Sequence, residues 1–322
     1  MTNVIHTVTG TCRPGDLGLT LMHEHLIIGW PGWESDAAGA PFDRRETKRR
    51  CVDRMLELKA LGVSALVDPC PIDLGRDVEF AAEVAQASGV HVVCATGLYK
   101  EESGAAPYFK FRSAFTDSVS EMSEIFVKEV TDGIGSTGIK AGVIKVATGP
   151  NQITPYERNV ITAAARAHKA TGAPITTHTD EGTMGREQLA ILIGEGVDAS
   201  RVIIGHSCGS ADLRYHVDLL DRGAYLGFDR FGLELLHPDR LRLAALIGLL
   251  GIGFEHRIVL SHDTVWCWRG RPLPLPVEQL APKWDPRYVL QHIVPALRDA
   301  GVQQAKIDTM LIENPKRYFE GT

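Results

Sequence analysis

The chain has 322 residues, of which 44% are hydrophobic, and its 34 lysines and arginines against 40 aspartates and glutamates give a formal net charge of −6. The basic residues form no long stripe, so this composition argues against a nucleic-acid partner. No apolar run reaches the roughly 18 residues needed to span a bilayer, which argues against a membrane protein.

The N-terminal segment comes first in the chain. Its residues, MTNVIHTVTGTCRPGD, contain no basic segment followed by an apolar one, so we expect no secretory signal and a cytoplasmic location. Six cysteines are scattered without a CxxC motif, and a chain of this length needs no disulfides, so we interpret them as reduced thiols. The partners that we expect are a small molecule and a second copy of the chain.

About eight short apolar runs follow, each bounded by glycine, proline or acidic residues. In chain order they are TLMHEHLI, SALVDPC, VHVVCATG, AGVIKVATG, APITTHT, RVIIGHS, AYLGFD and RIVLSHD. Helical periodicity with a nearby glycine fills most of the gaps, as in residues 51–62 and 186–196. The alternation predicts parallel βαβ units, and about eight of them favour a closed (β/α)8 TIM barrel that residues 1–322 form as a single domain.

Three stretches do not fit the repeating unit. We expect a small β-rich cap at residues 1–19 and a loop rich in glycine and aromatic residues at 30–41. The third stretch, residues 264–288, is a long proline-rich connection after the last strand. Barrel active sites lie at the C-terminal ends of the strands, so the last stretch would form a lid or a channel for a substrate tail.

The stretch GIGSTG, residues 133–138, matches the dinucleotide fingerprint G-x-G-x-x-G. It follows a helical pattern and precedes a strand, whereas the fingerprint requires a strand, a loop and then a helix. We therefore interpret it as a loop between a helix and a strand.

Polar residues recur at or near the C-terminal ends of the predicted strands. Residues i and i+2 of a strand share a face, so His23 and His25 can bind one cation while Glu24 points away. A single histidine after a strand is more often a hydrogen-bonded structural residue, but several at one end of a barrel core would need partners. The set that predicts a metal site is His23, His25, Lys145, His178, His206 and Asp263.

Lys145 lies within an apolar strand, IKVA, where a charged ammonium is strongly disfavoured. A neutral amine reacts with CO2 to form an anionic carbamate, whose two oxygens can bridge two divalent metals about 3.5 to 4 Å apart. The alternative is a lysine that extends its charge to solvent or pairs with an acid.

The motifs HEH, IKVA, THT, GHS and SHD, in this order, resemble the amidohydrolase superfamily and specifically the phosphotriesterase family with its carboxylated lysine. The resemblance covers essentially the whole chain. The stretches TGLYKEESGAAPYFKFR, GFDRFGLE and LSHDTVWCWRGRP resemble the phosphotriesterase-like lactonases, most of all the branch that prefers γ- and δ-lactones with aliphatic tails. The run VWCWRGRPLPLP matches no family-wide motif, so the physiological lactone, an acyl-homoserine lactone included, stays open.

The resemblance implies two divalent metal ions and a homodimer. His23, His25 and Asp263 would bind the more buried metal and His178 and His206 the more exposed one. Lys145, carboxylated by CO2, would bridge both. We expect zinc, and cobalt, manganese or iron are alternatives because such nitrogen and oxygen ligands accept several divalent metals.

The resemblance also implies roles around the metals. Tyr99 would lie against the bridging solvent and the substrate carbonyl, Arg230 would shape the pocket, and Asp263 would transfer a proton. The alternatives are a packed aromatic residue with a satisfied hydroxyl for Tyr99 and, for Arg230, an ion pair with a barrel-top carboxylate such as Asp229. Three tryptophans either line the tail channel or pack to order the last loop: Trp266, Trp268 and Trp284.

The expected activity is hydrolysis of a small-molecule lactone to a hydroxy acid, with organophosphate triester hydrolysis as a side reaction. One alternative is a primary phosphotriesterase, and another is a mononuclear deaminase of the same superfamily, which needs no bridging lysine. A third is a barrel protein with a structural metal and no enzymatic activity. Structural zinc sites are usually closed and cysteine-rich, unlike this ligand set.

Overall fold

The computed structural model describes residues 4–39, 42–273 and 275–321. Residues 1–3, 40–41 and 274, which belong to the predicted cap and to the two predicted loops, lie outside the described residues. No described helix combines the length and the apolar character that crossing a membrane requires.

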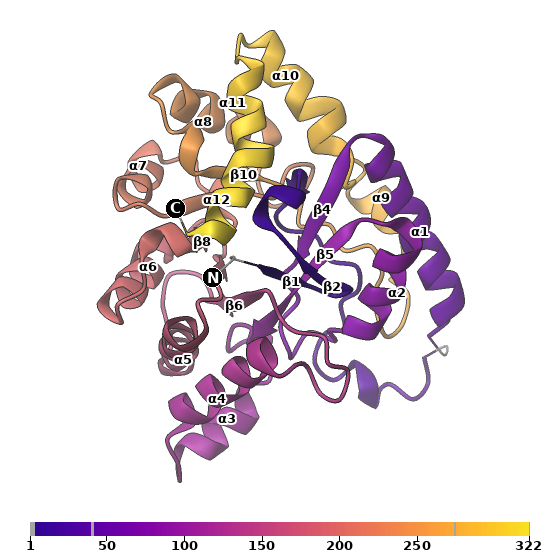
Figure 1. Cartoon of the computed structure of the whole chain (residues 1–322), viewed down its shortest axis with the longest axis vertical. Coiled ribbons are helices and arrows are strands. Elements are labelled where there is room, and N and C mark those ends of the chain that lie inside the picture. The colour runs from indigo at the N-terminus through magenta and orange to yellow at the C-terminus, as the bar shows by residue number, and fades with distance from the viewer. Residues whose placement is uncertain (1–3, 40–41, 274, 322) are drawn as a thin grey trace.

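Eight strands form one parallel sheet in which each strand pairs with the next along the chain. They are β3 (Leu19–Leu21), β4 (Val63–Asp68), β5 (His91–Gly97), β6 (Val143–Ala147), β7 (Ile175–His178), β8 (Val202–Ile204), β9 (Tyr225–Phe228) and β10 (Ile258–Leu260). Helices lie around these strands in Figure 1. The prediction of a (β/α)8 TIM barrel is confirmed.

The two predicted helical segments, residues 51–62 and 186–196, overlap α1 and α6 with shifted ends. For example, residues 51–62 fall mostly in α1, which begins earlier because the Asp43 side chain caps the backbone N–H of Glu46. The α-helices are α1 (Arg44–Ala60), α2 (Val78–Ser88), α3 (Ala106–Ser113), α4 (Ser118–Thr131), α5 (Pro155–Thr171), α6 (Gly185–Gly194), α7 (Leu213–Asp221), α8 (Asp239–Gly251), α9 (Val277–Leu280), α10 (Val294–Asp299), α11 (Gln304–Asp308) and α12 (Asn314–Glu320).

The segments outside the repeating unit agree with expectation where they are described. β1 (Ile5–Thr7) and β2 (Gly10–Cys12) form an antiparallel hairpin before the barrel. GIGSTG lies between α4 and β6, in a loop where the N–H of Ile134 donates to the carbonyl of Ile139 at 2.8 Å, so it is not a nucleotide fingerprint.

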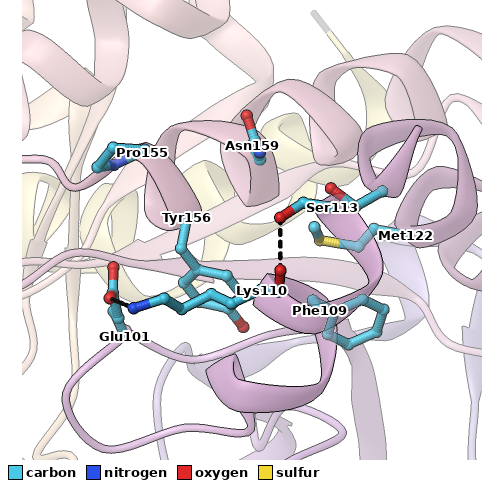
Figure 2. Close-up of a pocket in the computed structure, with 9 residues that line it drawn as sticks. Glu101, Phe109, Lys110, Ser113, Met122, Pro155, Tyr156 and Asn159 are labelled. Atoms are coloured by element: carbon cyan, nitrogen blue, oxygen red, sulfur yellow. Dashed lines mark hydrogen bonds and ion pairs between the residues drawn. The ribbon is translucent and has the colours of Figure 1, made fainter. Parts of the chain in front are cut away.

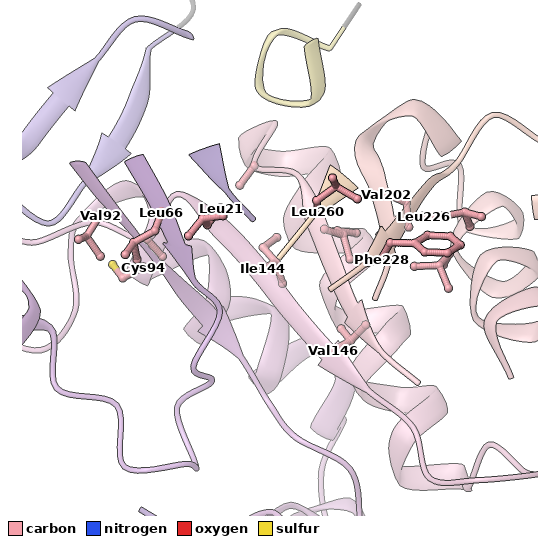
Figure 3. Packing of buried hydrophobic residues seen from close by; sticks show 14 of the residues in the cluster. Leu21, Leu66, Val92, Cys94, Ile144, Val146, Val202, Leu226, Phe228 and Leu260 are labelled. Atoms are coloured by element: carbon pink, nitrogen blue, oxygen red, sulfur yellow. The ribbon is translucent and has the colours of Figure 1, made fainter. Parts of the chain in front are cut away.

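The hydrophobic core lies between the strands and the surrounding helices. Figure 3 shows part of it, with Leu66 of β4, Ile144 of β6 and Phe228 of β9 among its members. Successive strand residues point to opposite faces. Ile144 and Val146 therefore pack in this core, while Lys145 between them points into the barrel interior toward His23.

The barrel closes beyond the strands β3 and β10 rather than within them. The N–H of Asp263 donates to the carbonyl of His23 at 3.0 Å, and the N–H of His25 donates to the carbonyl of Thr264 at 2.9 Å. The predicted first strand, TLMHEHLI, is therefore too long: β3 ends at Leu21, because the chain then leaves it to pair with the segment after β10.

Candidate metal centre

The six predicted ligands meet at the C-terminal end of the barrel; we call them the strand-end cluster. They are His23, His25, Lys145, His178, His206 and Asp263, and none is more than 9% exposed. His206 lies two residues after β8 and Asp263 three residues after β10, so each follows its strand rather than ending it. Both adopt a left-handed backbone, with φ of 58° and 57°, a conformation that non-glycine residues adopt chiefly where function or packing demands it.

Three of the imidazole rings, those of His23, His25 and His206, each present one nitrogen to Asp263. His23 Nε2 lies 3.3 Å from Lys145 Nζ and 3.3 Å from Asp263 Oδ1. His25 Nε2 lies 3.2 Å from the same Asp263 oxygen, and His206 Nε2 lies 3.7 Å from Asp263 Oδ2. Asp263 is thus the group around which the centre is arranged.

A buried carboxylate, Asp229, holds the far side of two of these rings. Its oxygens lie 3.1 Å from His23 Nδ1 and 2.9 Å from His206 Nδ1, and it also accepts the backbone N–H of His206 at 2.9 Å. An N–H on the far nitrogen of each ring leaves a lone pair on the nitrogen that faces the centre. This is the arrangement by which proteins orient histidine ligands of metals.

The other two histidines are held in the same way. His25 Nδ1 lies 3.2 Å from Asp68 Oδ1. His178 Nε2 lies 2.7 Å from Asp180 Oδ1, and Lys100 Nζ donates to the second oxygen of Asp180 at 2.5 Å. All four rings are thus fixed by carboxylates that the sequence did not single out as site residues.

Glu24 points away from the centre, as expected, and fixes the segment after β10. One of its oxygens accepts from the Ser261 hydroxyl at 2.7 Å and from the backbone N–H of His262 at 3.0 Å, and it lies 2.6 Å from His262 Nδ1. The other oxygen accepts from the Thr264 hydroxyl and backbone N–H. This fully buried carboxylate therefore sets the path of the chain on both sides of Asp263.

Burial keeps three of the histidines neutral. It lowers the pKa of His23 to about 3, and the nearby Lys145 ammonium acts in the same direction. Burial likewise moves the pKa of His178 well below its ordinary value and lowers that of His206. Neutral imidazole is the form that binds a metal.

The remaining ligands also titrate unusually. Burial lowers the pKa of Lys145 to about 8, although carboxylates nearby oppose the shift. Burial opposes ionisation of Asp263, but the neighbouring rings of His206 and His23 and the guanidinium of Arg230 hold the pKa of that carboxyl well below its usual value. Burial would lower the pKa of His25, but hydrogen bonds to Asp263 and Asp68 raise it well above 6.5.

The donor set fits a divalent metal. Among the described residues, His206 Nε2 is buried without a hydrogen-bond partner, although it faces the centre. Ligand atoms of His23, His25 and Asp263 all lie within 4.8 Å of one another. A cation would satisfy the orphaned nitrogen, and nitrogen and oxygen donors of this kind accept several divalent metals.

Tyr99 and Arg230 both reach the cluster. The Tyr99 hydroxyl lies 3.4 Å from His178 Nδ1, and burial raises the pKa of the phenol far above 10, so it remains a proton donor. Arg230 Nε donates to Asp263 Oδ2 at 2.9 Å. Arg230 therefore forms the ion pair with a barrel-top carboxylate that the alternative named, with Asp263 as the partner, while Asp229 is bound to His23 and His206.

A cavity of about 270 Å³ opens above the cluster. Tyr99, Arg230, Trp268 and Trp284 are among the residues that line it, so two of the three predicted tryptophans face the space for a substrate. Trp266 does not line this cavity and instead fits the packing alternative: it lies in the hydrophobic core, 3% exposed, and its indole N–H donates to the Thr264 hydroxyl at 3.0 Å.

A second cavity lies outside the cluster, where α3, α4 and α5 meet. Figure 2 shows Phe109 and Lys110 from α3, Met122 from α4 and Tyr156 from α5 around it. Lys110 Nζ pairs with Glu101 at 2.6 Å at its edge. No member of the strand-end cluster lines this second cavity.

Comparison with known proteins agrees with this geometry. The model of the Phosphotriesterase family matches residues 3–319. A Mycobacterium tuberculosis protein named phosphotriesterase homology protein is 39% identical over 320 residues, which cover 98% of this chain and 97% of the relative.

Two similar solved structures extend the comparison. The organophosphorus hydrolase from Deinococcus radiodurans superposes with a TM-score of 0.96 at 42% identity, covering 98% of this chain and 97% of that one. A structure described as "Molecular Engineering of Organophosphate Hydrolysis Activity from a Weak Promiscuous Lactonase Template" has a TM-score of 0.95 at 41% identity and covers 98% and 99% of the two chains.

Proposed function

The chain belongs to the phosphotriesterase family, and we propose that it is a binuclear metal-dependent lactonase that opens γ- and δ-lactones to hydroxy acids. Hydrolysis of organophosphate triesters is its side activity. The observation that carries this proposal is the orientation of the four histidines. The near nitrogens of His23, His25 and His206 face Lys145 or Asp263, that of His178 faces the Tyr99 hydroxyl, and carboxylates hold the far nitrogens of all four.

Each ligand has a definite place in the proposal. His23, His25 and Asp263 would hold one cation and His178 and His206 the other. The neutral amine of Lys145, which a pKa of about 8 makes accessible near neutrality, would take up CO2 and lose a proton, and the carbamate would be a ligand of both. Two divalent cations in these places supply Lewis acidity toward a carbonyl oxygen and acidify a water molecule.

The chain's own groups complete the reaction. The Tyr99 hydroxyl donates a hydrogen bond to the oxygen on which negative charge develops as the lactone carbonyl becomes tetrahedral. Ionised Asp263 accepts the proton of the attacking water and passes it to the leaving ring oxygen. Arg230 holds one oxygen of Asp263 in place at 2.9 Å, so the other oxygen keeps its direction.

The cavity supports a lactone with an aliphatic tail. Apolar side chains, among them Ile28, Leu74, Leu233 and Trp268, form much of its wall, while the polar residues gather at the cluster. Such a wall favours a hydrocarbon chain whose carbonyl end meets Tyr99. The relative described as a weak promiscuous lactonase template supports the same assignment.

A comparison of catalytic efficiencies on protein of measured metal content tests the proposal. We expect kcat/KM for γ-nonalactone and δ-decalactone to exceed that for a paraoxon-type ester by about 100-fold or more, a difference of about 2.7 kcal/mol in transition-state binding. A higher value for the ester would identify a primary phosphotriesterase. One metal per chain at full activity would favour the mononuclear alternative. An acyl-homoserine lactone in the same panel defines the ring and tail preference.

Chelation separates an enzyme from a structural metal protein. Removal of the metals should abolish lactone hydrolysis while the chain stays folded, and added zinc should restore it. Unfolding on chelation, or no activity in the metal-loaded protein on any lactone or ester, would favour the structural alternative.

A further inference from the structure

Two of the six cysteines touch each other. Cys51 Sγ on α1 lies 3.6 Å from Cys267 Sγ in the loop after β10, by which we mean residues 264–288. Neither is part of the strand-end cluster. Among the described cysteines, all of which are free thiols, these two form the only pair in hydrogen-bond contact.

Cys267 also has a route to solvent. It lines a hollow of about 410 Å³ between α1 and the loop after β10, and the guanidinium-bearing Arg50 and Arg54 line the same hollow. The α9 segment of the loop lies beside α1 in Figure 1, and Arg54 pairs with Glu278 of α9 at 3.4 Å. Cys267 is thus the residue of the pair that lines a space large enough for a small solute.

The two thiols differ in their readiness to ionise. A hydrogen bond from the Cys51 thiol lowers the pKa of Cys267, burial opposes this, and Arg50 and Arg54 add to the lowering. The same contact raises the pKa of Cys51. Low-pKa thiols beside cationic groups are the ones that oxidants attack.

We propose that Cys51 and Cys267 form an oxidative modification site, which hydroperoxides convert to a disulfide. The Cys267 thiolate attacks the O–O bond, becomes a sulfenic acid and releases hydroxide or alkoxide. The Cys51 thiol then attacks the sulfenic sulfur, forming the S–S bond and releasing water. The two thiols lose two electrons, and the O–O bond of the peroxide accepts them.

Closure of this bond affects the wall of the substrate cavity. A disulfide requires sulfurs about 2.05 Å apart, so the two must approach by about 1.5 Å. The residue after Cys267 is Trp268, which lines the cavity. The carbonyl of Cys267 accepts the backbone N–H of Ile28, a second residue of the cavity wall, at 3.0 Å. Oxidation therefore alters the fit of a substrate tail; this consequence, unlike the disulfide itself, rests on the proposed function.

The chemistry is tested on the full zinc-loaded chain, because zinc undergoes no redox reaction with peroxide. After treatment with hydrogen peroxide, we expect thiol titration to find four cysteines instead of six, and peptide mapping to find Cys51 linked to Cys267. Dithiothreitol should restore all six. Six thiols after treatment, or a different linked pair, would overturn the proposal.

Three variants assign the roles. In Cys51→Ser, dimedone should trap a sulfenic acid at Cys267, whereas in Cys267→Ser it should not label Cys51. Cys12→Ser is the matched control, because Cys12 is 8% exposed against 7% for Cys267 and burial raises its pKa to about 11. The Cys12→Ser control should form the disulfide normally. In Cys51→Ser, labelling of Cys12 as fast as Cys267 would contradict the proposal.

A comparison of lactones with long and short tails tests the coupling to the cavity. Oxidation should change kcat/KM for δ-decalactone several-fold more than for a lactone without a tail, and reduction should reverse the change. A disulfide that leaves both values unchanged would refute the coupling. Failure of the reduced protein to hydrolyse lactones would instead refute the proposed function, and thiol titration would still decide the modification site.

Discussion

The strand-end cluster and the loop after β10 face the same cavity but are held in different ways. Every histidine of the cluster has a carboxylate on its far nitrogen, and the cluster is buried throughout. In the described part of the loop, the one α-helix is the four-residue α9. Leu273 and Leu275, which precede this helix, are each 47% exposed. Under the proposed function, the cluster supplies the chemistry and the loop selects the substrate.

The largest expected effect on activity comes from replacing Lys145 of the strand-end cluster. Lys145→Ala should lower kcat on γ-nonalactone roughly 1,000-fold or more, since metal polarisation and water activation supply several kcal/mol of the barrier. Metal content per chain, measured by atomic emission, should fall with it. The exposed Lys169→Ala on α5 is the control, and full activity with two metals in Lys145→Ala would disprove the mechanism.

Asp229→Asn tests whether the carboxylates that hold the far nitrogens of the histidines contribute to zinc binding and activity. The amide has one accepting oxygen for two imidazoles and one backbone N–H, so at least one ring loses its orientation. We expect zinc affinity or activity to fall about 10- to 100-fold. Asp218→Asn, which changes a partly exposed partner of Arg186, should leave both unchanged. An unaltered zinc titration in Asp229→Asn would show that the ligands need no such support.

The lowered pKa of Lys145 predicts that assembly of the metal centre depends on pH. The amine reacts with CO2 only when neutral, and with a pKa of about 8 its neutral fraction falls as the pH is lowered. That fraction is about half at pH 8 and about 1% at pH 6. At fixed dissolved CO2, metal-free protein to which zinc is added should regain activity about 50-fold more slowly at pH 6 than at pH 8.

The control for this experiment is Lys145→Glu, which carries a permanent carboxylate. Any pH dependence that remains in this variant belongs to the other ligands, because His25 must also lose a proton before it binds a metal. Its recovery should not depend on dissolved CO2. A wild-type rate that is equally independent of CO2 would exclude the carbamate.

The sequence predicted the barrel and the convergence of six polar residues because strand ends occupy one face of the fold. It did not single out the supporting carboxylates, although a signal was present. Asp68 ends β4, Asp229 directly follows β9 and Asp180 lies two residues after His178. The rule that selected the histidines applies equally to these aspartates.

The loop after β10 could not be predicted from periodicity. Trp266 and Trp268 are two residues apart and would share a face in a regular strand. The segment is not a strand, and the Thr264 hydroxyl binds the indole of Trp266 and turns it into the core. Contacts distant in sequence, such as the bond from the Trp284 indole to the carbonyl of His262 at 2.9 Å, order the rest of the loop.

The smallest expected effect on activity comes from Trp268, and its neighbour Trp266 should affect stability instead. Trp268→Ala should lower kcat/KM for δ-decalactone about five- to tenfold and that for a tailless lactone less, because only the tail loses an apolar wall. Trp266→Ala should instead lower the free energy of unfolding by about 3 kcal/mol or more, measured in urea, since it leaves a cavity in the core. Equal loss of efficiency on both lactones in Trp268→Ala would mean that the loop acts on the metal centre as well as on the substrate tail.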